Sequence, residues 1–183
     1  NSLDNCTSLT YIYFGEKFNC PLSNCFDNCT ALTHITFGHS FNQPLDNSLD
    51  KCTLLTHIEF GNWFNEPLAN SLENCSSLTH INCGLNFNCQ LYNALDNCTE
   101  LTHIEFGHDF SQSLANCLDN CALLTHLFFV SISCFNQPLV NSLVNCLSLT
   151  ILVFGDKFNC PLSNALINCT ALTHIEFGSC FNQ

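Results

Sequence analysis

Apolar residues recur along this chain at a fixed spacing. The segment Leu-x-x-Ile-x-Phe, or a close variant of it, begins at Leu9, Leu32, Leu55, Leu78, Leu101, Leu124, Leu149 and Leu172. Consecutive copies begin 23 residues apart, except for one step of 25 residues. A fixed period in this range is typical of a stack of similar supersecondary units. The pattern therefore predicts a repeat solenoid.

Each copy of the segment contains a short predicted strand. Over residues 101–107, the apolar side chains of Ile104 and Phe106 alternate with the polar side chains of His103 and Glu105. Alternation of this kind is what a strand with one buried face requires. We therefore expect one parallel sheet of eight short strands, with the Ile and Phe positions inside and the His and Glu positions outside.

The rest of each unit reads Phe-Asn-x-Pro-Leu-x-Asn-x-Leu-x-Asn-Cys. Proline fixes φ and disfavours helix at the residue before it, so the first part is expected to be extended or a turn. The Asn-x-Leu-x-Asn-Cys part predicts a short helical or 3₁₀ turn, with loops, on the side opposite the sheet. A period of 23 residues leaves no room for more than one turn of helix beside a strand.

Residues 1–183 are predicted to form a single solenoid of about eight 23-residue repeats. Both ends of the sequence fall inside a repeat. Neither end shows the capping unit, with a polar outer face, that a solenoid needs for solubility. We therefore expect a fragment of a longer array.

The repeat resembles known families. Leu-x-x-Ile-x-Phe followed by a turn and Asn is close to the leucine-rich repeat signature, and Asn-Cys-Thr-x-Leu-Thr-x-Ile resembles the BspA-type subclass. The stretch from Phe37 to Leu45 resembles the FNIP repeat, which occurs in social amoebae and giant DNA viruses, often behind an F-box. The resemblance implies a protein-interaction module, such as the recognition part of an F-box-type receptor. The alternative is a rigid structural or surface protein of virion or adhesin type.

Charge argues against two kinds of partner. The net charge is -12, there is no Arg, and the three Lys residues are Lys17, Lys51 and Lys157. Binding of nucleic acid relies on clustered Lys and Arg, and so does binding of an anionic membrane surface. No apolar run reaches the 18 or so residues of a membrane-spanning helix. We therefore expect neither nucleic acid nor membrane as a partner, and another protein instead.

Cysteine is abundant, with 16 residues, and half of them share one repeat position. Neighbours in a parallel stack point the same way, which disfavours disulfides between them. We predict a buried ladder of thiols and an intracellular, reducing compartment. The alternative, a virion or extracellular surface, would be favoured by disulfides. The members of this cysteine ladder are Cys6, Cys29, Cys52, Cys75, Cys98, Cys121, Cys146 and Cys169.

A column of histidines is expected on the outer face of the sheet, at His34, His57, His80, His103 and His126. Imidazoles ligate metals and titrate near neutrality, so these residues are candidates for a metal-binding or pH-sensing stripe. The alternative is a consensus residue copied by duplication. No nucleophile, base and orienting group recur together. We therefore expect no enzyme activity and no cofactor.

The sixth unit breaks the repeat. Two residues are inserted, the turn glycine is lost, and Phe128 replaces an outward polar residue. An exposed apolar patch on a sheet face is a candidate site for a protein partner. The alternative is that the inserted loop folds over the patch. The predicted partner-binding residues are Phe128, Val130, Ile132, Ile151 and Val153, with Tyr11 and Tyr13 as a smaller aromatic pair at the other end.

Overall fold

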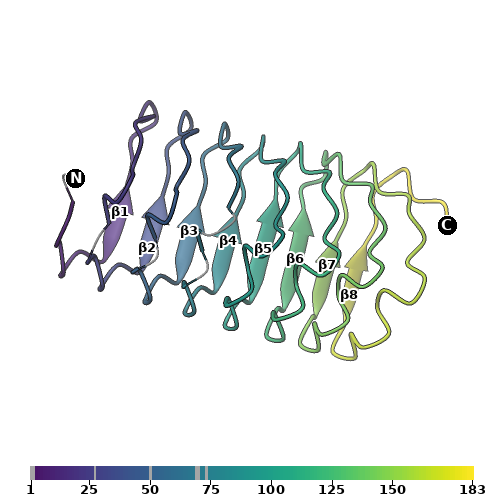
Figure 1. Ribbon diagram of the computed structural model, residues 1–183. Helices are drawn as coiled ribbons and strands as arrows, with labels where there is room; N and C mark the ends of the chain where they lie inside the picture. Colours follow the sequence, from purple (N-terminus) through teal and green to yellow (C-terminus); the bar gives the residue numbers. More distant parts are fainter. Residues whose placement is uncertain (1–2, 27, 50, 69–70, 73) are drawn as a thin grey trace.

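The computed structural model describes residues 3–26, 28–49, 51–68, 71–72 and 74–183. In these ranges the chain winds into a solenoid, each turn of which adds one strand to a parallel sheet in chain order (Figure 1). The predicted parallel solenoid is confirmed. Its strands are β1 (Tyr11–Tyr13), β2 (His34–Thr36), β3 (His57–Glu59), β4 (His80–Asn82), β5 (His103–Phe106), β6 (His126–Phe129), β7 (Ile151–Val153) and β8 (His174–Glu176).

Neighbouring strands pair in the register of the repeat. His34 lies opposite His57, and Ile35 lies opposite Ile58. The same pairing of like residues continues through β5, so each sequence column becomes a column on the sheet. The second residue of every strand from β1 to β7 is buried, and the first and third residues, which point outward, are half-buried or exposed.

Phenylalanine rings fill the core between the sheet and the opposite side. Within one unit the ring at the end of the strand stacks on the ring that follows the turn, as Phe60 does on Phe64 with centroids 4.2 Å apart. The same rings also stack on their counterparts in the next unit, as Phe64 does on Phe87 at 6.0 Å. Burying each such side chain stabilises the fold by roughly 1.5–3 kcal/mol. Each ring needs neighbours from two units, so no unit closes its own core.

Tight turns, and not helix, form the side opposite the sheet. No residue that the structure describes is helical, so the prediction of a short helical or 3₁₀ turn was wrong there. Single hydrogen bonds close successive turns, for example from Cys52 N–H to Leu49 O at 2.9 Å. Asn47 has a positive φ of 59°, and a helix cannot continue through that conformation. Equivalent asparagines at Asn24, Asn93, Asn116, Asn141 and Asn164 also have positive φ.

A second column of asparagines joins the units beside the sheet. The Oδ1 atom of Asn42 accepts a hydrogen bond from the backbone N–H of Asn65, and Asn65 accepts one from Asn88 in the same way, both at 2.8 Å. Ser111 takes the next place in this asparagine ladder, and Asn136 and Asn159 resume it beyond. The ladder therefore changes at the unit that carries the insertion.

The inserted residues form a small bulge after β6. Val130 N–H still donates to Phe106 O, and Cys134 N–H donates to His108 O at 2.7 Å, so pairing with the previous unit resumes at Cys134. The extra length is taken up between these two points, where Ile132 is 57% exposed. The insertion therefore alters one loop and leaves the stack intact. In the described ranges no helix is long and apolar enough to cross a membrane.

Candidate partner-binding face

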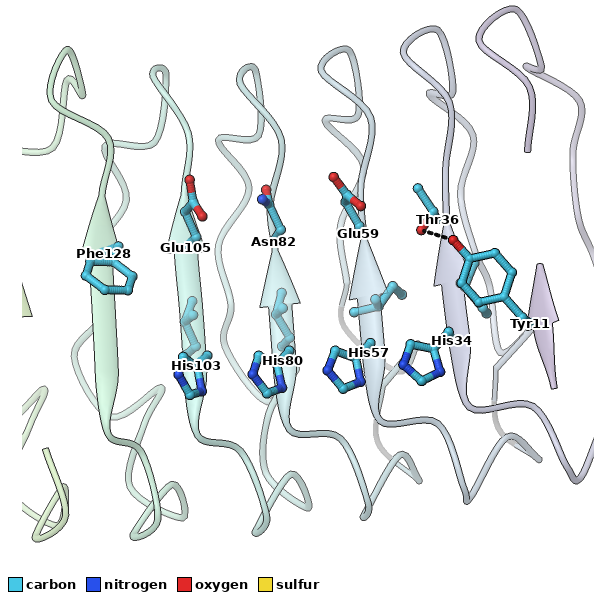
Figure 2. Close-up of a pocket in the computed structure, with 14 residues that line it drawn as sticks. Tyr11, His34, Thr36, His57, Glu59, His80, Asn82, His103, Glu105 and Phe128 are labelled. Carbon is cyan, nitrogen blue, oxygen red and sulfur yellow. Dashed lines mark hydrogen bonds between the residues drawn. The ribbon is translucent and has the colours of Figure 1, made fainter. Parts of the chain in front are cut away.

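Five imidazoles form a stack across the outward face of the sheet. Ring centroids of successive histidines are 4.1–4.4 Å apart, and the ring planes differ by 9–12°. The phenol of Tyr11 extends the stack at one end, 5.9 Å from His34. This histidine ladder consists of His34, His57, His80, His103 and His126, and Figure 2 shows its first four members in a row.

The threonine before each histidine determines which nitrogen of the imidazole carries the proton. The hydroxyl of Thr56 donates its single hydrogen to Thr33 O, at 3.0 Å. The same oxygen lies 2.8 Å from Nδ1 of His57, so Nδ1 must be the donor in that contact. The pattern repeats at His34, His80, His103 and His126. Each neutral imidazole therefore carries its proton on Nδ1 and leaves the Nε2 lone pair for a ligand.

Packing makes the middle of the ladder harder to protonate. Partial burial lowers the pKa of His57, His80 and His103 below the ordinary value of 6.5, and the neighbouring imidazoles lower each pKa further. Charge on one ring disfavours charge on the next because the rings are in contact. These three imidazoles therefore present neutral acceptors near pH 7.

A groove runs along the histidine ladder. It has a volume of about 460 Å³ and spans β1 to β6. A second column, two residues further along each strand, forms its other side with Thr36, Glu59, Asn82, Glu105 and Phe128. Tyr11 closes one end, where its hydroxyl lies 3.4 Å from Thr36 Oγ1, and Phe128 lies at the other end (Figure 2).

The structure brings three of the predicted apolar residues together on this face. Phe128 pairs with Val153 in register, and Ile151 pairs with His126. All three are half-buried, and Phe128 lines the groove, so the inserted loop leaves them accessible. Val130 and Ile132 lie on the bulge that follows β6, half-buried and exposed respectively. Whether these residues bind a partner stays a prediction.

The two predicted tyrosines have separate surroundings. Tyr11 and Tyr13 are 54% and 56% exposed. Tyr11 belongs to the groove, whereas Tyr13 donates a hydrogen bond to Glu16 Oε1 at 3.0 Å and lines a smaller, more polar hollow. Only Tyr11 is therefore placed to contact a ligand that lies along the histidine ladder.

The cysteine ladder lies inside the turn side. Its thiols donate weak hydrogen bonds to carbonyl oxygens of the preceding unit, as Cys98 Sγ does to Leu72 O at 3.8 Å. Burial raises the pKa of Cys98 and Cys146 to about 12, with a smaller contribution from nearby carboxylates and, at Cys146, from Cys169. These thiols are protonated at neutral pH and act as small apolar core groups.

Metal binding by the histidine ladder stays a prediction. Parallel stacked rings direct their Nε2 lone pairs side by side, while a tetrahedral ion needs ligands that converge. Another group, which the sequence analysis missed, places three potential ligands close together. Nδ1 of His108 lies 2.5 Å from Asp109 Oδ1, and Cys134 Sγ lies 4.0 Å from Nε2 of the same histidine. The 26-residue step from His108 to Cys134, one period plus the insertion and one residue, was the available signal.

The fold and its repeat define the class of protein. The chain matches the family model of the BspA type leucine-rich repeat region over residues 1–98 and 91–183. The chain therefore belongs to the BspA-type leucine-rich repeat family, and the predicted resemblance to BspA-type repeats is confirmed. A comparison with curated proteins finds no match.

Solved structures share this architecture. CroV588, a circular leucine-rich repeat protein of a giant virus, is 40% identical over 97% of this chain, with a TM-score of 0.79. Toll of Drosophila in its complex with Spatzle is 15% identical over 91% of the chain (TM-score 0.71), and an internalin (InlF) of Listeria monocytogenes is 18% identical over 85% (TM-score 0.50). The chain spans 25%, 23% and 50% of those three chains, respectively.

Proposed function

We propose that this chain is a non-catalytic protein-interaction module that binds an extended segment of a partner along the histidine ladder. The groove between Tyr11 and Phe128 carries the proposal. Leucine-rich repeat proteins generally mediate protein interaction or adhesion through such sheet surfaces. Toll, which shares the fold, is known in complex with Spatzle.

The dimensions of the groove set the length of its ligand. It crosses six strands, from β1 to β6. Parallel strands lie about 4.8 Å apart, so the groove is roughly 24 Å long. An extended peptide advances about 3.3 Å per residue, so about seven residues fill it. The ligand runs across the strands, and therefore its contacts come from side chains of the sheet and not from a strand edge.

The chemistry of the groove favours a basic ligand. The Nε2 lone pairs accept hydrogen bonds, and Glu59 and Glu105 add carboxylates on the opposite side. The chain as a whole carries a net charge of -12, which attracts cationic segments over a distance. Tyr11 and Phe128 offer aromatic faces at the two ends, which suit an apolar or cationic side chain. The expected ligand thus combines Lys or Arg with an apolar anchor.

A displayed library of random seven-residue peptides tests this proposal. We expect enrichment of Lys-containing or Arg-containing peptides, and Phe128→Ala to weaken binding of the enriched peptides at least tenfold, about 1.4 kcal/mol. Leu147→Ala is the matched control because Leu147 is 54% exposed and lies outside the groove. Circular dichroism checks that both variants fold. Unchanged binding by Phe128→Ala, enrichment of acidic peptides, or no enrichment contradicts the proposal.

The finer role we propose is that this chain forms the recognition part of an F-box-type receptor in a reducing, intracellular compartment. Its support is the resemblance to FNIP repeats and the buried, protonated thiols of the cysteine ladder. The second candidate is a rigid structural or virion-surface protein, which the similarity to CroV588 favours. The sequence that flanks this chain in its gene discriminates between them. An F-box supports the receptor, and a signal peptide contradicts it.

A further inference from the structure

A cluster of three potential metal ligands lies on the loops after β5 and β6, apart from the groove. Within the described residues, His108, Asp109 and Cys134 are the group whose ligand atoms all lie within 4.8 Å of one another. All three side chains are half-buried, so solvent reaches them. None of them lines the groove along the histidine ladder.

Backbone hydrogen bonds hold the cluster in place. Asp109 N–H donates to Leu85 O at 2.9 Å, and Cys134 N–H donates to His108 O at 2.7 Å. Cys134 therefore occupies the same loop position as Asp109, one unit later. The two-residue insertion is taken up before this point, so Cys134 stands directly beside the imidazole. The loops of two units supply the cluster, and neither could form it alone.

The aspartate sets the chemistry of the imidazole. A carboxylate is an acceptor, so His108 donates its Nδ1–H to Asp109 across their 2.5 Å contact. The Nε2 lone pair then faces Cys134 Sγ at 4.0 Å. A carboxylate behind the ring of a ligating histidine is the common way of orienting it and of strengthening it as a ligand.

The separation of sulfur and nitrogen fits a tetrahedral ion. Bond lengths of about 2.3 Å to sulfur and about 2.1 Å to nitrogen place the two ligand atoms about 3.6 Å apart at a tetrahedral angle. A movement of a few tenths of an ångström from 4.0 Å achieves this. One thiolate and one imidazole suit a borderline-soft ion such as Zn²⁺ better than Mg²⁺ or Ca²⁺.

We propose that this chain binds Zn²⁺ through Nε2 of His108 and Sγ of Cys134, with Asp109 holding the imidazole in the ligating tautomer. Two protein ligands leave the remaining positions of the ion open to water. The site lies on the loop edge and does not depend on the proposed function of the sheet face. Ion binding releases the thiol proton of Cys134 to solvent, because the thiolate is the ligand.

Titration of the metal-free, reduced chain with Co²⁺ tests the site, because a thiolate ligand gives a near-ultraviolet charge-transfer band. We expect one equivalent of Co²⁺ to saturate that band and Zn²⁺ to displace it. Cys134→Ser should abolish the band, and Asp109→Asn should weaken affinity by about 10-fold to 100-fold. His108→Ala should weaken affinity by at least as much, since it removes a direct ligand.

Cys180→Ser is the matched control. Cys180 is exposed and its N–H makes the equivalent bond, to Asp156 O, so Asp156 and Lys157 stand where the cluster has His108 and Asp109. This variant should keep the wild-type titration curve. No band in the wild type, a band that survives Cys134→Ser, or a band lost in Cys180→Ser each overturns the proposal. Thermal unfolding of the metal-free variants separates loss of ligand from loss of fold.

Discussion

Single residues of the repeat are constrained by the unit next to them. Thr56 must both donate to the preceding unit and accept from its own histidine, and only a hydroxyl does both. Gly61 is constrained by space. A Cβ atom added there would lie 1.9 Å from Gly38 O, whereas one added at Gly15, at the start of the array, would meet nothing within 4 Å.

Gly61→Ala and Gly15→Ala form a matched pair. The first should destabilise the chain by about 1–3 kcal/mol, because the backbone of one unit must move away from the other. The second should be neutral or stabilise by up to about 1 kcal/mol, since the alanine restricts the unfolded chain without a clash. Urea unfolding of both variants measures the difference, and equal effects would contradict the close approach.

At the scale of elements, strands that bear the same residue in the same place couple to one another. The histidine ladder joins five strands through contacts between like rings. The ionisation of His57, His80 and His103 is coupled to that of their neighbours, because a proton on one ring raises the cost of a proton on the next. The sheet is therefore sensitive to pH across several strands at once.

The stability of the chain should rise with pH through the titration of the ladder. The pKa values of His57, His80 and His103 are lowered on folding, so the unfolded chain binds more protons below 6.5. This contribution is complete above the unfolded value and is lost as pH falls through the lower folded values. Urea unfolding between about pH 7.5 and about pH 5.5 measures the slope.

A triple variant isolates the ladder. Replacing His57, His80 and His103 by Gln keeps polar side chains on the face and removes the three groups with lowered pKa. The variant should show a shallower dependence of unfolding free energy on pH over the same range. A slope as steep as that of the wild type would mean that other groups dominate.

Local pattern predicted the strands, but not the turns between them. The alternation of Ile104 and Phe106 with polar neighbours is contained within a few residues, and it suffices for a strand. Asn47 stood in a stretch whose spacing also fitted a helical turn. Its positive φ depends on side-chain and backbone geometry that composition does not reveal.

The sequence predicts the two candidate sites to different degrees, because the groove depends on local strand pattern and the His108 cluster depends on contacts between units. Phe128 and Tyr11 could be placed on the outer face from the strand pattern alone, and both line the groove. The cluster of His108 and Cys134 depends on how the insertion is absorbed between two units. Sequence spacing does not show whether the extra residues lie before or after the cysteine, and the backbone hydrogen bonds decide it.

At the scale of the whole molecule, stability is distributed along one axis. Each unit contacts its neighbours in the stack, so stability is a sum of unit terms and interface terms. Strands β1 and β8 have one neighbouring strand each, and the others have two. Burial follows this order: Ile104 and Leu127 in the middle are 1% and 0% exposed, while Ile12 is 9% exposed and Ile175 is only half-buried.

Amide hydrogen exchange should therefore be graded along the solenoid. We expect the slowest exchange at the central strands β4 to β6 and progressively faster exchange toward β1 and β8, because the end units open without disturbing the middle. Exchange measured by mass spectrometry on peptides from each unit provides the profile. Uniform protection from β1 to β8 would instead indicate a single cooperative unit.

The bulge after β6 also distinguishes the sixth unit from the other units. Strands that carry like residues in like register, such as β2 and β3, can exchange places in the array with little change in their contacts. An array of interchangeable units can shift its alignment by one unit during folding, or exchange units with a second chain. The sixth unit differs from the others in its inserted residues and in Phe128, which pairs with Glu105 on one side and with Val153 on the other, so slippage would change these contacts. The irregular unit thus favours one alignment of the whole stack over alignments shifted by one unit.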